Sequence, residues 1–149
     1  MNVITREATE KDVPNCAELL HALFSQELEF HPDLNLQIQG LTQIINSPDT
    51  GRILVAETDH KVIGMVSLLF SISTALGGKV ATLEDLIIQE PYRKQGIGKQ
   101  LIQAAFEFAK NQECLRITLL TDHTNNTAIR FYESFGFTKS PMIPLRKLL

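Results

Sequence analysis

The sequence predicts an α/β fold in which a mixed, mostly antiparallel sheet carries helices on both faces. Three apolar, β-branched segments (residues 52–57, 62–73 and 80–89) follow one another through short turns, as adjacent antiparallel strands do. An amphipathic helical segment and a further strand come next, which is the order of a parallel crossover. The chain of 149 residues has the length of one domain, so we expect residues 1–149 to share a single core.

The N-terminal part predicts one strand and two helices. Residues 3–8 favour a short strand, and Thr9 and Asp12 have the spacing of a capping box at a helix start. Apolar residues then recur at every third or fourth position, which predicts a helix over residues 13–28. A proline-containing segment ends this helix, and a second one is expected over residues 34–45.

The C-terminal part predicts two more helices and at least two more strands. An apolar stripe indicates a helix over residues 97–110, and alternation indicates a strand over residues 115–120. A short helix over residues 125–135 is expected to end at Gly136, a residue suited to a left-handed cap. The remaining residues, 137–149, are expected to supply a last strand or two.

Composition excludes several classes of function. The net charge of −3 gives no overall basic field, so we expect no nucleic-acid partner. No apolar stretch approaches the ~18–20 residues of a membrane span, and the first residues lack the basic head and apolar run of a signal peptide. We therefore expect a cytoplasmic protein with no membrane partner.

The cysteines and histidines do not indicate a metal centre. Cys16 and Cys114 are too few for a disulfide framework or a structural zinc site, and we expect both to be small buried side chains. The four histidines lack the spacing of metal ligands, so no metal is expected.

The most informative segment is a glycine turn, defined here as residues 93–99, between an apolar strand and an amphipathic helix. The first N–H groups of a helix lack partners and carry the positive end of its dipole. Gly96 and Gly98 allow phosphate oxygens to approach the main chain. Three basic side chains surround the same point: Arg93, Lys94 and Lys99. The pattern predicts an anion site.

This turn is neither a P-loop nor a dinucleotide fingerprint, because Leu101 stands where the latter has its third glycine. The pattern Arg-x-x-Gly-x-Gly resembles the acyl-coenzyme A pyrophosphate turn of the GNAT superfamily of N-acetyltransferases. Residues 125–137 are similar to a second signature of that family, Asn-x-x-Ala-x-x-x-Tyr followed by Gly-Phe. The order of the predicted elements also matches the family fold over nearly the whole chain.

The resemblance implies that acetyl-CoA is the cosubstrate and lies between two parallel strands that splay apart, here residues 80–89 and 115–120. It implies that the pantetheine arm pairs with the backbone of residues 86–88, and that the pyrophosphate binds N–H groups of residues 93–98. The residues assigned to acetyl-CoA in this way are Leu86, Ile87, Ile88, Arg93, Lys94, Gln95, Gly96, Ile97, Gly98, Lys99, Asn125, Ala128, Phe131 and Tyr132.

Amine attack on a thioester needs a base for the amine proton and an acid for the leaving sulfur. Tyr132 falls on the family's tyrosine position, and a phenol pKa of ~10 lies just above the ~8.5 of a thiol, which suits the acid. Glu84 is the candidate base, because Leu83-Glu84-Asp85 resembles the diamine acetyltransferases. Other branches carry this glutamate two residues earlier, at Thr82, and Glu84 alternatively only binds the substrate ammonium.

The identity of the acceptor is left open by the sequence. The set of Glu27, Glu29, His31 and Asp33, with Glu84, is rich in carboxylates and suits a cationic amine, or is simply a solvated helix end. The layout also resembles aminoalkylphosphonate acetyltransferases, which would use cationic side chains. Four such residues are available: His31, His123, Arg130 and Arg146.

The resemblance implies direct transfer of acetyl from acetyl-CoA to a primary amine of a small molecule, in a ternary complex. A protein or peptide amine is the alternative acceptor, and a non-catalytic acyl-CoA-binding module is the alternative to an enzyme. A homodimer is compatible with the family, but no residue in the chain establishes it.

Overall fold

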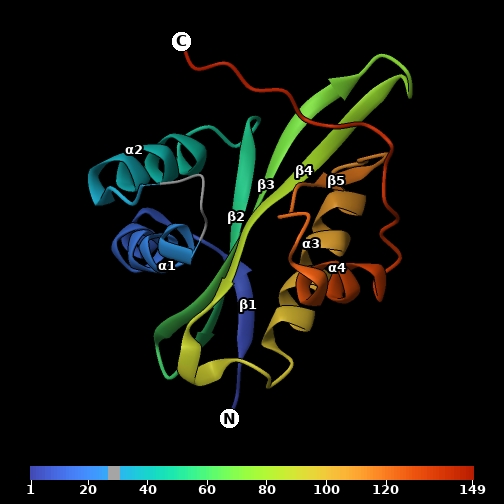
Figure 1. Ribbon diagram of the computed structural model, residues 1–149. Coiled ribbons are helices and arrows are strands. Elements are labelled where there is room, and N and C mark those ends of the chain that lie inside the picture. Colours follow the sequence, from blue (N-terminus) through green and yellow to red (C-terminus); the bar gives the residue numbers. More distant parts are fainter. Residues whose placement is uncertain (27–30) are drawn as a thin grey trace. The chain divides into compact units, whose positions relative to one another are not determined.

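The computed structural model describes residues 1–26 and 31–149, which form two compact units, residues 1–119 and 120–149 (Figure 1). The first unit contains a five-stranded sheet in the order β1-β2-β3-β4-β5. Its strands are β1 Ile4–Glu7, β2 Gly51–Thr58, β3 Lys61–Ser73, β4 Gly78–Ile88 and β5 Ile117–Leu119. The first four strands pair antiparallel and β4 pairs parallel with β5. The predicted mixed, mostly antiparallel sheet is confirmed.

Helices cover both faces of this sheet, as predicted. The helices α1 Val13–Gln26 and α2 Leu34–Ile45 pack on one face, and α3 Ile97–Asn111 packs on the other (Figure 1). Buried side chains of α1, α2, β2 and β3 share one apolar cluster, which includes Met65 and Val55. On the opposite face Leu101 of α3 approaches the backbone of β3 so closely that a Cβ at Gly64 would lie 3.3 Å from it.

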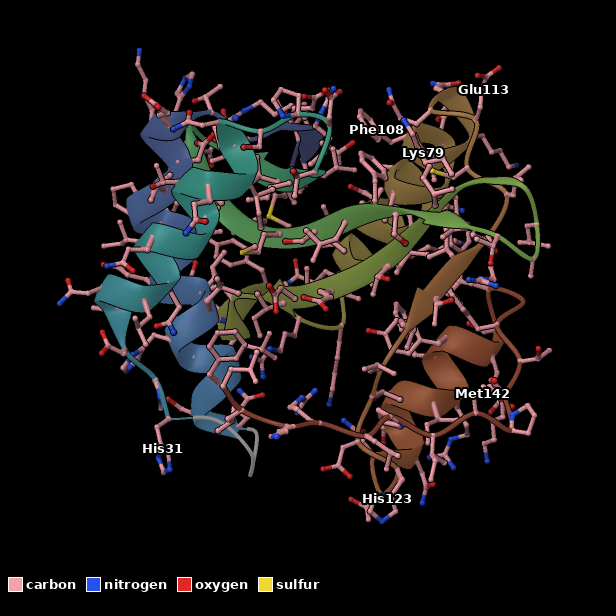
Figure 2. The ribbon with its side chains drawn as sticks, turned by 90° about the horizontal axis from the view of Figure 1, so that it is seen from above. His31, Lys79, Phe108, Glu113, His123 and Met142 are labelled. Carbon is pink, nitrogen blue, oxygen red and sulfur yellow. The ribbon has the colours of Figure 1, made fainter. Side chains whose placement is uncertain are left out.

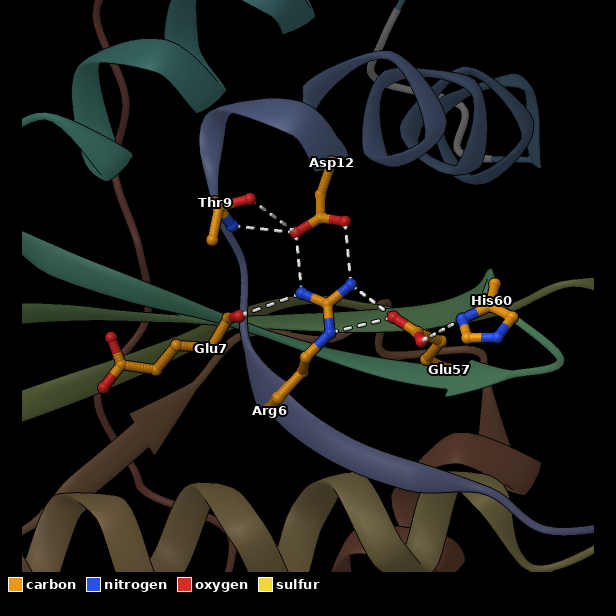
Figure 3. A network of polar contacts seen from close by, with 6 residues as sticks. All are labelled: Arg6, Glu7, Thr9, Asp12, Glu57 and His60. Carbon is orange, nitrogen blue, oxygen red and sulfur yellow. Dashed lines mark hydrogen bonds and ion pairs between the residues drawn. The ribbon is translucent and has the colours of Figure 1, made fainter.

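A polar network anchors the start of α1 to the sheet (Figure 3). The guanidinium of Arg6 in β1 donates hydrogen bonds to both carboxylate oxygens of Asp12, at 2.8 and 3.0 Å, and also to Glu57 in β2. Asp12 in addition accepts the backbone N–H of Thr9 at 2.8 Å, as the capping-box spacing predicts. The box begins a short 3₁₀ turn, η1 Glu10–Asp12, which leads into α1.

The second unit contains α4 Asn126–Glu133, and Gly136 follows it with a φ of +94°, so the predicted left-handed end of this helix is confirmed. The prediction of a last strand or two within residues 137–149 is wrong: no residue there has strand structure. Pro141 and Pro144 lack the N–H that a ladder needs, and the N–H of Met142 is taken by the Ser140 hydroxyl at 3.1 Å.

Three smaller expectations have mixed outcomes. The strand expected over residues 115–120 is confined to Ile117–Leu119. Cys16 is fully buried and its thiol pKa is raised by burial to about 12, whereas Cys114 is only half-buried. Among residues 1–26 and 31–149, no helix has the length and apolar character to cross a bilayer.

Candidate active site

The parallel strands β4 and β5 separate after a short shared stretch. Their pairing covers residues 81–83 of β4 and residues 117–119 of β5, and β5 ends there. The other edge of β4 stays paired with β3 as far as Ile88. Within the described chain, the backbone of residues 84–88 therefore has one edge without a strand partner. The predicted parallel pairing of the two strands is confirmed. An extended ligand can add to such an edge as a strand would.

A β-bulge lies at the point of separation. Met65 of β3 stands opposite Ile87, and Ser67 stands opposite Glu84. Two residues of β4, Asp85 and Leu86, thus face one residue of β3, and Asp85 has a φ of +56°. A bulge bends its strand and frees main-chain groups from the ladder. The bulge also interrupts the regular alternation of side chains between the two faces of the sheet along β4.

Glu84 projects from the face of the sheet that carries α1 and α2. Its cross-strand neighbour Ser67 lies on the same face as Met65, which belongs to the apolar cluster under these helices. Glu84 is exposed, and the described residues offer it no hydrogen bond or ion pair. Its carboxylate is therefore available to a ligand.

The glycine turn presents unbonded backbone N–H groups. The strand β4 passes through η2 Glu90–Tyr92 into the turn, where Lys94 and Gly96 take left-handed conformations with φ of +62° and +83°. Among the described residues, the N–H groups of residues 94–99 donate no backbone hydrogen bond, and the first that does is Gln100, to the Gly96 carbonyl at 3.1 Å. The N–H of Arg93 is already bonded to Glu90, at 3.2 Å, so the free set begins one residue later than predicted.

Open space adjoins these N–H groups. A Cβ built at Gly96 would meet no atom within 4 Å, so this glycine is required by its positive φ rather than by lack of room. The side chains of Arg93, Lys94 and Lys99 are exposed around it. One of them is also structural, because Arg93 Nε donates a 2.8 Å hydrogen bond to the Ile88 carbonyl.

A pocket of about 360 Å³ lies in the first unit beside the end of β4. It includes three residues predicted to contact the cosubstrate, Ile87, Ile88 and Arg93. Its other wall is the exposed side of α1, which sequence reasoning missed: Asn15, Glu18, Ala22 and Gln26. Their spacing of three and four residues marks one helix face, which is the signal that could have identified this wall.

The second unit carries Tyr132 on α4. Its ring packs edge-on against Phe131 and Phe137, with centroid distances of 5.4 and 5.8 Å. Burial raises the pKa of Tyr132 above its usual value, so the phenol is protonated at neutral pH. Asn125, predicted to contact the cosubstrate, has a structural role as the N-cap of α4, because its Oδ1 accepts the N–H of Ala128 at 3.0 Å.

The comparison with known families decides the identity of this fold. The model of the acetyltransferase (GNAT) family matches residues 15–137. The chain belongs to this family. The predicted family membership is confirmed.

Individual relatives agree with this GNAT assignment. N-acetyltransferase 8 of Homo sapiens is 35% identical over 86 residues, which are 58% of this chain and 38% of that longer protein. Glucosamine 6-phosphate N-acetyltransferase of Trypanosoma brucei brucei is 27% identical over 139 residues, covering 89% and 86% of the two chains. The crystal structure of a possible acetyltransferase from Clostridium difficile 630 has the same fold, with a TM-score of 0.89 at 17% identity over 100% and 99% of the chains.

The predicted acceptor residues of this GNAT-family chain are only partly described. Glu27 and Glu29 lie outside the described residues. His31 is exposed at the connection between α1 and α2, with its ring directed away from the sheet (Figure 2). In the described ranges, no three His, Cys, Asp or Glu side chains come close enough to hold a metal ion. The first unit thus brings together Glu84, residues 86–88 and the glycine turn.

Proposed function

We propose that this GNAT enzyme transfers the acetyl group of acetyl-CoA to a primary amine of a small molecule by direct attack in a ternary complex. Two observations carry the proposal: one edge of residues 84–88 has no partner strand in the described chain, and the N–H groups of residues 94–99, which follow along the chain, donate no backbone hydrogen bond there. The family match extends through both compact units, which supports one N-acetyltransferase domain over residues 1–149.

The residues present fit acetyl-CoA as the cosubstrate. Unbonded N–H groups at a helix N-terminus favour a diphosphate, and the three exposed basic side chains of the turn add positive charge. The unpaired edge of residues 86–88 suits the amide groups of a pantetheine arm. In the second unit we assign Asn125, Ala128, Phe131 and Tyr132 to the same ligand. When bound, acetyl-CoA supplies an activated acetyl carbon and a thiolate leaving group.

Glu84 is proposed as the general base. A primary amine with a pKa of ~10 is mostly ammonium at neutral pH and must lose a proton to attack. An exposed carboxylate without a partner among the described residues, on the sheet face beside the bulge, can first attract the ammonium and then accept its proton. Glu84 passes this first proton to solvent. As the nitrogen then bonds to the acetyl carbon, the carbon–sulfur bond breaks, and a second proton leaves the nitrogen for the Glu84 carboxylate.

Tyr132 is proposed as the general acid. Its hydroxyl has no hydrogen-bond partner among the described residues, and burial raises its pKa, so it holds a proton for the departing sulfur. Transfer of that proton leaves a phenolate and a neutral thiol, so charge is balanced once the phenolate is reprotonated from solvent.

The acceptor is proposed to be a small amine that carries polar or anionic groups. Glucosamine 6-phosphate, which the name of the trypanosomal relative specifies, is one member of this class. The pocket beside β4 offers both signs of charge, from Glu18 and Lys61, and His31 is an exposed residue of the first unit.

The test is thiol release from acetyl-CoA with a panel of amines: polyamines, aminosugar phosphates, aminophosphonates, aminoglycosides and peptides. We expect a small amine to be acetylated and Glu84→Gln to lose about 10²-fold in kcat. Glu107→Gln, an exposed glutamate on α3, is the matched control. Acetylation of peptides alone would contradict a small-molecule acceptor and indicate a peptide acetyltransferase. Binding of acetyl-CoA without acetylation of any amine would indicate a non-catalytic binding module.

A further inference from the structure

A buried hydroxyl lies beside the proposed base. Ser67 on β3 is 0% exposed, and its Oγ has no hydrogen-bond partner among residues 1–26 and 31–149. Its directly opposite residue on β4 is Glu84. Opposed residues of an antiparallel pair project from the same face with Cβ atoms about 4.5–5.5 Å apart. Rotation of the exposed Glu84 side chain therefore brings its carboxylate within reach of the Ser67 hydroxyl.

The position of Ser67 is otherwise apolar. Its neighbours on the same face, Met65 on β3 and Ile53 opposite it on β2, belong to the buried core. A hydroxyl buried without a partner lowers stability, so packing alone favours alanine or valine there. A serine at the border between this core and Glu84 is explained by a hydrogen bond that forms when the carboxylate takes its working position.

We propose that Ser67 is a positioning residue whose hydroxyl donates a hydrogen bond to the Glu84 carboxylate while the acceptor amine is bound. This inference deepens the proposed function and rests on the assignment of Glu84 as base. Ser67 does not itself exchange a proton with substrate.

Such a contact would fix the orientation of the Glu84 side chain. Glu84 is exposed and has no partner in the described chain, so its side chain samples several rotamers. A general base must lie within hydrogen-bond distance of the proton it removes. A hydrogen bond from a neutral hydroxyl to a carboxylate is short and strong, and one fixed on a central strand holds the base in a single orientation.

The first experiment compares three variants of the full chain with an amine that the unaltered protein acetylates. Ser67→Ala removes the hydroxyl, Ser67→Cys keeps the size with a weak donor, and Ser67→Thr keeps the hydroxyl. We expect kcat to fall about tenfold in the Ala and Cys variants and to stay within about threefold in the Thr variant. The KM for acetyl-CoA should change by less than about twofold, because Ser67 is not assigned to that ligand.

Thr58→Val is the matched control. Thr58 is also buried, at 4% exposure, and its hydroxyl has no partner in the part of the chain that the structure describes, but it lies at the far end of β2, paired with Lys61. Its removal should leave kcat unchanged. An equal loss in Thr58→Val, or full activity in both Ser67→Ala and Ser67→Cys, would overturn the proposal. Circular dichroism melts verify folding, and the Ala and Cys variants decide the matter if Ser67→Thr does not fold.

A double-mutant cycle separates positioning from a general effect on packing. If Ser67 acts through Glu84, adding Ser67→Ala to Glu84→Gln causes no further loss of kcat. Multiplicative losses would contradict the proposal and indicate a structural role. The two proposals can be distinguished. An unchanged kcat in Glu84→Gln would contradict the assignment of Glu84 as base and therefore also the role of Ser67. A low kcat in Glu84→Gln together with an unchanged kcat in Ser67→Ala would contradict only the role of Ser67.

Discussion

The Nε atom of Arg93 donates a 2.8 Å hydrogen bond to the main-chain carbonyl of Ile88. The bond joins the last residue of β4 to the glycine turn. This hydrogen bond therefore fixes the strand edge proposed for the pantetheine arm relative to the N–H groups proposed for the diphosphate. An arginine at this position serves both as a charge for the ligand and as a brace for the backbone that binds it.

Replacing Arg93 should weaken acetyl-CoA binding through both effects. Arg93→Lys keeps the charge but not the planar donor set, so we expect the dissociation constant to rise about tenfold. Arg93→Ala also removes the charge and should raise it further, to about 30-fold or more. Calorimetry checks both values. Lys110→Ala, at the far end of α3, is the control and should bind as the unaltered chain does.

Tyr132→Phe should separate chemistry from binding. We expect kcat to fall about 10²-fold while the dissociation constant of acetyl-CoA changes by less than about threefold, because only the acidic proton is lost. Tyr92→Phe removes the other tyrosine hydroxyl of the chain and should leave kcat unchanged. Loss of binding in step with kcat would show that Tyr132 contributes contact rather than acid catalysis.

The pH dependence of turnover gives a further check on Tyr132. An acid must be protonated, so turnover falls as pH rises through the pKa of this phenol. Burial raises that pKa above its usual value of about 10. We therefore expect that the titration of Tyr132 causes no fall of kcat below about pH 10. Any fall of kcat at lower pH should also occur in Tyr132→Phe. A fall of kcat near pH 8 that is present in the unaltered chain and absent from Tyr132→Phe would contradict the assignment.

The network at Arg6 should make stability dependent on acid. Hydrogen bonding to Arg6 lowers the pKa of Asp12, so its stabilisation is complete above the unfolded value of about 4 and is lost as pH falls through the folded pKa. We expect Asp12→Asn to reduce the free energy of unfolding by about 2 kcal/mol at pH 7 and by progressively less as the pH falls below about 4. Urea denaturation measures this difference.

The control for this experiment is Glu7→Gln. Glu7 accepts hydrogen bonds from Arg52 at 3.2 and 3.3 Å, but half of its side chain is exposed. An exposed ion pair contributes about 0–1 kcal/mol, so the change should be small at either pH. Equal effects of the two substitutions would contradict a special role for Asp12.

The elements of the first unit could be predicted because each has a strong local signal. The apolar period of residues 97–110 and the β-branched run of residues 62–73 act over many residues, and the structure places α3 and β3 there. The C-terminal strands could not be predicted in this way, because alternating apolar residues form a strand only beside a partner, and two prolines limit that pairing.

Features of the site that depend on the register between two strands could not be predicted from the sequence. The bulge at Asp85 exists only in the register between β3 and β4, so no spacing along β4 reveals it. The pairing of Ser67 with Glu84 has the same origin. The wall formed by α1 was missed because the spacing of its exposed residues marks one helix face but does not by itself indicate a ligand.

The glycine turn is the element on which the proposed cosubstrate depends, and a pair of matched glycines tests it. Gly96 and Gly77 have similar φ values, +83° and +76°, and a Cβ at either would meet no atom within 4 Å. Alanine therefore strains the two backbones alike, but only at position 96 does the added methyl occupy the space beside the N–H groups of the turn. Calorimetric titration with acetyl-CoA should show a loss of affinity of about tenfold or more in Gly96→Ala and none in Gly77→Ala. Equal affinity in both variants, or no binding of acetyl-CoA by the unaltered chain, would contradict the proposed site.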